Sequence, residues 1–223
     1  MKKGLLTLTA LLVPLAAIAG PFDGPYVGVH LGQADARDKG VGHDQATGAN
    51  DGWSQKTTPD GALYGLMGGY NWRLGGNWLV GVEADFEGRS GSDRSFQKED
   101  GVTDTGVAAK TQLKSAASLR GRVGYVFDNR AAVYATAGYA TASVKRTWYD
   151  IPFGPQTESH TSWQDGWTAG VGVDYLLTGK IAARLEYRHT DYGTKKVSAN
   201  LWDEFYKQSL TEDSVRVGLS YQF

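Results

Sequence analysis

An alternation of apolar and polar residues with a period of two constrains the fold of this chain more than any other feature. Such alternation indicates strands with one apolar face, and most segments come close to the about 9 to 11 residues that a tilted strand needs to cross a bilayer. The pattern predicts strands at residues 25–34, 62–72, 77–88, 112–127, 131–143, 166–176, 180–191 and 214–223. We therefore expect an all-β protein.

The connections between these strands are alternately long and short. Short turns are expected at Arg73 to Gly76, Asp128 to Arg130 and Leu177 to Gly179. Long polar segments are expected near residues 35–61, 89–111, 144–165 and 192–213. This order places every long loop at one end of a meander, as in transmembrane barrels. The sequence thus predicts an eight-stranded antiparallel up-and-down transmembrane β-barrel.

Glycine decides which face of the strands points inward. Period-two alternation and a charge-free apolar face fit a soluble barrel such as a lipocalin as well as a membrane barrel. Glycine on a solvent-facing strand position loses chain entropy, whereas the narrow inside of an eight-stranded barrel requires small residues beside large ones. The polar faces carry Gly124, Gly138, Gly170, Gly172 and Gly218. We infer that the polar face lines the lumen and the apolar face meets lipid.

Aromatic residues are expected to form a band at each edge of the apolar face, as interfacial girdles do. One band, beside the short turns, contains Tyr70, Trp72, Trp78, Tyr125, Phe127 and Tyr175. The other, nearer the long loops, contains Phe86, Trp148, Trp167 and Tyr187. Strand propensity alone explains the number of aromatic residues but not this banding.

The first nineteen residues have the pattern of a secretory signal peptide. Lys2 and Lys3 precede an apolar run that ends in Ala17-Ile18-Ala19, so we expect cleavage after Ala19 and a barrel domain over residues 20–223. No later segment reaches 18 apolar residues, which excludes a helical membrane protein. The mature chain keeps 21 basic and 24 acidic residues, without the basic excess of a nucleic-acid-binding protein.

Two motifs carry a resemblance to a known family. The C-terminal run SVRVGLSYQF ends in Phe223, with Tyr221 third from the end, and GWTAGVGVDYLLTGKIAARLEYRHTDYG precedes it. These segments resemble the Gram-negative outer-membrane β-barrel family related to the OmpA transmembrane domain, in particular the porin-like surface proteins of alphaproteobacteria. The resemblance implies an outer-membrane location and recognition of Tyr221 and Phe223 by the barrel assembly machinery. The peptidoglycan-binding domain of full-length OmpA proteins is not expected.

Charges of both signs fall on the inward face. A paired network is expected among Glu83, Asp85, Glu87, Arg120, Arg122, Asp174, Arg184, Glu186, Arg188 and Arg216. Such a network either fills the lumen, because buried charges must be compensated, or lines a narrow water path. Eight-stranded barrels are filled by side chains, which favours filling. The predicted function is therefore an integral outer-membrane protein of the cell envelope with a structural or porin-like role.

Catalysis has little support in this sequence. His30, His43, His160 and His189 lie outside any HExxH motif, and no GxSxG motif is present. We expect no enzyme activity, cofactor or metal, so an enzyme acting on lipid A is a remote alternative. The stronger alternative is a surface adhesin or receptor, in which the long loops contact host or phage ligands. Outer-membrane lipid and lipopolysaccharide are the other expected partners.

Overall fold

A computed structural model describes residues 20–151 and 156–223, so the expected signal peptide lies outside the described residues. The described chain forms strands β1 (Gly24–Asp44), β2 (Asn50–Thr57), β3 (Gly61–Arg73), β4 (Trp78–Arg89), β5 (Ser92–Glu99), β6 (Val102–Phe127), β7 (Ala131–Asp150), β8 (Gln156–Leu176), β9 (Ile181–Ala199) and β10 (Glu204–Gln222). One 3-10 turn, η1 (Asn200–Trp202), precedes β10.

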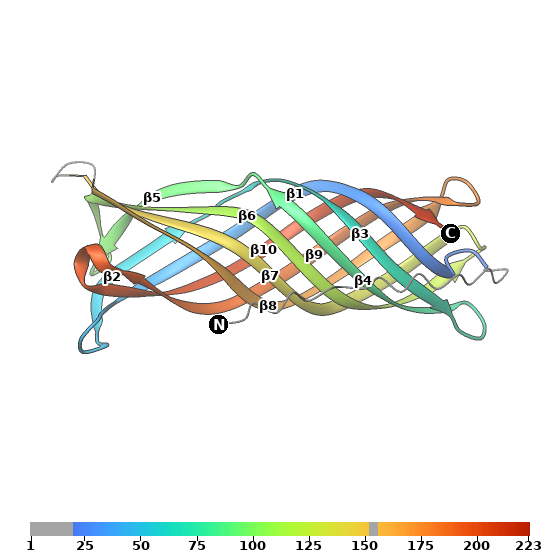
Figure 1. Ribbon diagram of the computed structural model, residues 1–223, viewed down its shortest axis with the longest axis horizontal. Coiled ribbons are helices and arrows are strands. Elements are labelled where there is room, and N and C mark those ends of the chain that lie inside the picture. The colour runs from blue at the N-terminus through green and yellow to red at the C-terminus, as the bar shows by residue number, and fades with distance from the viewer. Residues whose placement is uncertain (1–19, 152–155) are drawn as a thin grey trace, which may run out of the picture.

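The strands close into a barrel (Figure 1). The order β1-β3-β4-β6-β7-β8-β9-β10 is antiparallel throughout, and the ring closes where β10 pairs with β1, with Val27 opposite Tyr221. Closure leaves no unpaired strand edge in this ring, and that is a requirement inside a bilayer. The predicted eight-stranded antiparallel barrel is confirmed.

The short turns lie where the sequence predicted them. Three tight connections join β3 to β4, β6 to β7 and β8 to β9. In the second, Asp128 and Asn129 both have positive φ, 47° and 53°, the conformation of a two-residue hairpin turn. We call this end, which also holds the C-terminus, the turn end. The opposite end, with β2, β5 and η1, is the loop end (Figure 1).

The expectation of long polar loops is wrong for most of their length. In these segments the strands of the ring continue beyond the predicted bounds, and β2 and β5 are added. Toward the loop end, β2 pairs with β1, β5 pairs with β2, and β5 also pairs with β6. The pair β2 and β5 thus takes the place that β3 and β4 hold nearer the turn end. The barrel is elongated and remains closed along its length.

The two faces of the barrel differ in chemistry as expected. Apolar side chains on alternate positions face outward, among them Leu66 at 65%, Phe86 at 57% and Val171 at 57% exposed. The intervening polar and charged side chains are buried inside. Among the described residues there is no helix that is both long and apolar enough to span a membrane.

Candidate functional site

The structure places all ten of the predicted inward charges in the interior of the barrel. Each of the ten residues is 6% exposed or less. They come from β4, β6, β8, β9 and β10, so residues up to about 130 positions apart in sequence meet on the axis. The alternation of side chains along each strand explains this arrangement. Every second residue points inward, and these inward side chains stack along the lumen.

Asp174 and Glu83 organise the part of the network nearest the turn end. Arg184 donates from Nε to Asp174 Oδ1 at 2.8 Å and from Nη2 to Oδ2 at 3.1 Å, a two-point contact. Arg122 donates to Asp174 Oδ2 at 2.6 Å. Glu83 accepts from Arg184 Nη1 at 2.5 Å and also contacts Arg120. Two-point arginine–carboxylate contacts fix geometry as well as charge.

The middle of the network continues the same pattern toward the loop end. Arg120 reaches Glu186 Oε1 at 3.0 Å and Asp85 Oδ2 at 3.1 Å. Arg188 contacts Asp85 at 3.2 Å and Glu186 at 2.8 Å. Arg188 also contacts Glu87 at 3.3 Å, and Arg216 contacts Glu87 at 2.9 Å. All ten predicted residues therefore belong to one connected set of ion pairs.

The network also includes residues outside the predicted set, among them two charged residues and two tyrosines. Arg89 pairs with Glu212 at 2.6 Å and joins the network through Glu87. Tyr26 donates to Glu83 Oε2 at 2.5 Å, and Tyr134 donates to Glu186 Oε2 at 3.0 Å. Among the described residues, the connected network then holds six arginines and six carboxylates, namely Arg89, Arg120, Arg122, Arg184, Arg188 and Arg216 with Glu83, Asp85, Glu87, Asp174, Glu186 and Glu212. Its formal charge is zero.

Inward glycines make room for the two buried tyrosines. A Cβ added at Gly69 would lie 2.7 Å from the Tyr26 hydroxyl oxygen, and one at Gly172 would lie 2.5 Å from that of Tyr134. Tyr134 in turn lies under Arg122, whose guanidinium carbon is 3.7 Å from the ring centroid. Small inward residues therefore accommodate large inward residues on neighbouring strands.

Buried apolar clusters lie in the barrel interior on both sides of the network. Toward the turn end, Phe22, Leu79, Val126, Ala132, Leu176 and Ala182 form one buried cluster. Toward the loop end, a second cluster contains Ala36, Leu113, Ala116, Ala140, Ala142, Val144, Tyr192 and Leu210. Beyond it, Arg146 makes a two-point contact with Asp38 at 2.7 and 2.9 Å. Side chains thus fill the lumen at successive levels.

Two of the histidines, one inward and one outward, each lie beside a carboxylate. His30 points inward, and its Nε2 lies 3.6 Å from Glu87 Oε2. His189 Nδ1 lies 2.8 Å from Asp213 Oδ1 on the half-exposed outer face. Within the described parts of the chain, no group of three or more histidine, aspartate or glutamate residues is arranged to hold a metal ion.

The outward face carries an apolar belt with aromatic residues at both edges. Exposed aromatic residues near the turn end include Trp72, Trp78, Tyr125, Phe127 and Tyr175, and those nearer the loop end include Tyr64, Phe86, Tyr139, Trp167 and Tyr187. The expectation for Trp148 is wrong, because it has the same strand parity as Tyr134 and is fully buried inside the barrel. Tyr221 and Phe223 lie on the outward face, and their rings meet edge to face.

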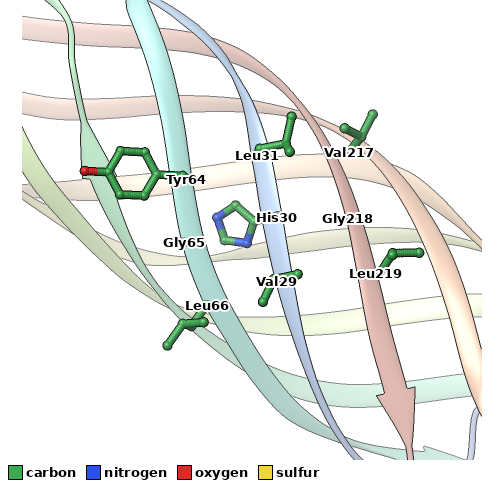
Figure 2. Close-up of a pocket in the computed structure, with 9 residues that line it drawn as sticks. All are labelled: Val29, His30, Leu31, Tyr64, Gly65, Leu66, Val217, Gly218 and Leu219. Atoms are coloured by element: carbon green, nitrogen blue, oxygen red, sulfur yellow. The ribbon is translucent and has the colours of Figure 1, made fainter.

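A shallow hollow of about 590 Å³ lies on this belt (Figure 2). It follows the seam where β3, β1 and β10 run side by side, and Leu31, Leu66 and Val217 are among the side chains that line it. These side chains are apolar and outward-facing. The hollow is therefore part of the surface that hydrocarbon covers in a bilayer.

Comparison with known proteins assigns the family. A family model described as the outer membrane protein beta-barrel domain matches residues 4–223. The chain belongs to this outer-membrane β-barrel family. The 22 kDa outer membrane protein of Rhizobium leguminosarum is 36% identical over 168 residues, covering 74% of this chain and 69% of that protein. The 25 kDa outer-membrane immunogenic protein of Brucella abortus is 31% identical over 218 residues, covering 95% and 82%. The protein is located in the bacterial outer membrane.

Solved structures agree on the fold of this outer-membrane barrel. OprG of Pseudomonas aeruginosa has a TM-score of 0.51 at 15% identity, and the match covers 92% of this chain and 98% of that one. The outer membrane protease OmpT of Escherichia coli also scores 0.51, at 13% identity, covering 93% and 99%. Identities this low establish a shared fold and transfer no activity.

Proposed function

We propose that the protein is a structural component of the outer membrane, a closed barrel that does not pass solutes. The observation that supports this role is the neutral network of six arginines and six carboxylates across the lumen, with apolar layers on both sides. A solute path requires these pairs to separate, which leaves uncompensated buried charge. The structural role is therefore favoured over the porin-like one.

Solute flux through the refolded protein tests this proposal. Liposomes that contain the protein should swell in solutions of small sugars or amino acids no faster than protein-free liposomes. A heat-dependent shift in gel mobility verifies that the protein in the same liposomes is folded. Swelling that scales with the amount of folded protein would contradict a structural role and favour a porin-like one.

This role implies two kinds of partner. Outer-membrane lipid, lipopolysaccharide included, covers the apolar belt, and the barrel assembly machinery recognises the last strand through Tyr221 and Phe223. Replacing Phe223 with alanine should lower the amount of barrel in the outer membrane several-fold. The same change at Phe127, another exposed aromatic residue of the turn end, is the control. Equal amounts of both variants would refute the recognition role.

A second candidate function is contact with host cells or phage at the loop end. The supporting observations are the elongation of the barrel by β2 and β5, and the name of the Brucella relative, a 25 kDa outer-membrane immunogenic protein. In barrels of this class the long connections lie outside the cell. Deleting β2 and β5 together with the loop-end parts of the ring strands, and joining the shortened strands by tight turns, should abolish binding of cells or phage to bacteria that carry the protein, whereas unchanged binding removes this candidate.

A further inference from the structure

A small cavity lies at the loop end, beyond the filled lumen. Its volume is about 60 Å³, and its lining comes from β2, β5, β6, η1 and β10, through Trp53, Gln97, Val107, Trp202, Glu204 and Tyr206. Glu204 is the first residue of β10 and lies far from the turn end, so the cavity is outside the membrane-spanning part of the barrel. Neither the charge network nor the apolar belt uses these residues.

The rings of Trp53, Trp202 and Tyr206 form half of the lining, and hydrogen bonds hold Tyr206 and the Trp148 ring behind it in place. Trp53 and Trp202 pack against a buried cluster that contains Trp148 and Tyr206. Trp148 donates from Nε1 to Gln55 Oε1 at 3.0 Å, and its ring centroid is 5.8 Å from that of Tyr206. The Tyr206 hydroxyl contacts Gln97 Oε1 at 3.0 Å. The wall is therefore ordered before any ligand arrives.

The charge at this cavity is negative and unbalanced. Glu204 is half-buried and accepts from the Tyr206 hydroxyl at 3.0 Å, and no ion pair to it occurs among the described residues. Asp51 and Asp44, which carry the same sign as Glu204, both act on it electrostatically and raise its pKa. Asp51 accepts from the Trp53 backbone through one oxygen, while its other oxygen is buried without a hydrogen-bond partner in the described structure. In the lumen, by contrast, carboxylates are matched by arginines.

We propose that this cavity binds the head of an alkylammonium ion, with Glu204 as the counter-charge and the rings of Trp53, Trp202 and Tyr206 around it. Aromatic faces attract cations through their quadrupole, and a carboxylate adds direct attraction. A cavity of about 60 Å³ has room for a few water molecules, and an ammonium group with its first methylene is of similar size. A sugar ring is too large for it, and the two carboxylates repel an anion.

The indole N–H signals of ¹⁵N-labelled protein test the proposal. The chain has seven tryptophans, and folded protein in neutral detergent should give one signal for each. Butylammonium should shift the Trp53 and Trp202 signals along a saturating curve, while the signals of the outward-facing Trp72, Trp78 and Trp167 stay in place. 1-Butanol, the neutral counterpart, should not reproduce the curve. Equal shifts with 1-butanol, or no saturation with butylammonium, overturn the proposal.

Two variants separate a binding role from a folding role. Glu204→Gln should weaken butylammonium binding about fivefold or more, because the counter-charge is lost. Asp35→Asn removes the same unit of charge from an exposed position on β1 and should leave affinity unchanged. Unshifted signals from the outward-facing tryptophans verify that both variants are folded. Equal affinity of Glu204→Gln and the unsubstituted protein overturns the proposal.

The dependence of affinity on pH gives an independent readout. Burial, and then the negative charge of Asp51, raise the pKa of Glu204 to about 7. The negative charge of Asp44 also raises the pKa of Glu204, and burial raises the pKa of the Tyr206 hydroxyl, which donates to Glu204, so that this hydroxyl stays neutral. Butylammonium affinity should therefore increase from pH 6 to pH 8 as Glu204 loses its proton. In Glu204→Gln this increase should disappear, and an identical increase in the variant contradicts the proposal.

Discussion

Glu83 shows what a single buried charge contributes to this barrel. Its carboxylate contacts Arg120, Arg122 and Arg184 and is fully shielded from solvent. Replacing Glu83 with glutamine keeps the shape and removes one negative charge, so the buried network is left with one uncompensated positive charge shared by three arginines. We expect the free energy of unfolding to fall by about 3 to 5 kcal/mol. Urea titration in lipid vesicles, followed by tryptophan fluorescence, measures it.

The same substitution at Glu99 is the matched control. Glu99 is exposed at the end of β5, so glutamine should change the free energy of unfolding there by less than about 0.5 kcal/mol. A loss at Glu83 no larger than the loss at Glu99 would show that the buried network contributes little to stability.

Alanine substitutions at two glycines on neighbouring strands distinguish crowding inside the barrel from the low strand propensity of glycine. A Cβ at Gly138 would lie 2.1 Å from the Leu119 carbonyl oxygen, whereas at Gly121 the nearest atom, the Ala137 carbonyl oxygen, is 3.8 Å away. Gly138→Ala should lower the free energy of unfolding by about 1 to 3 kcal/mol, because the backbone must move. Gly121→Ala should be neutral or slightly stabilising. The same urea titration compares them, and equal effects would refute crowding at Gly138.

At this scale the sequence predicted the inward positions well but not the whole network. Ten charged residues were found because each lies on the polar face of a predicted strand. Arg89 and Glu212 were missed because they fall in segments that were expected to be loops. Tyr26 and Tyr134 share the inward parity of the charged residues, so counting every inward side chain, not only the charged ones, would have found them.

At the scale of one strand, β10 tests the lipid-facing assignment. Val217 is outward-facing near the middle of the apolar belt, and Val102 is exposed at the loop end of β6. Val217→Arg should lower the free energy of unfolding in lipid vesicles by about 2 to 4 kcal/mol, because a charge then faces hydrocarbon. Val102→Arg should have almost no effect. A similar small effect at both positions would place Val217 outside the hydrocarbon.

The loop-end halves of the strands illustrate a limit of pattern reading. Beyond the apolar belt the outer face meets water and the inner face mixes polar with apolar side chains, so the contrast that marks a strand weakens. Buried and exposed positions still alternate there, as in β7, where Arg146 and Trp148 are buried between more exposed neighbours. The alternation of apolar and polar residues therefore identifies only the membrane-crossing part of a long strand.

At the scale of the whole molecule, the closure of the strand ring and the filling of its lumen have different causes. Pairing of β10 with β1 closes the ring, and backbone hydrogen bonds maintain it regardless of the inward side chains. Filling depends on those side chains, which form apolar layers, a neutral charge network and a separate Asp38–Arg146 pair. A barrel of the same strand order with small neutral inward residues would be closed at its edges and open along its axis.

Ion current through single barrels in a planar bilayer tests the filled lumen most directly. Folded protein, verified by its heat-dependent gel shift, should insert without producing stepwise currents in concentrated potassium chloride. This expectation follows from the proposed structural role, in which the arginine–carboxylate pairs and the two apolar layers block the lumen. Reproducible current steps of one size, proportional to the protein added, would contradict this account.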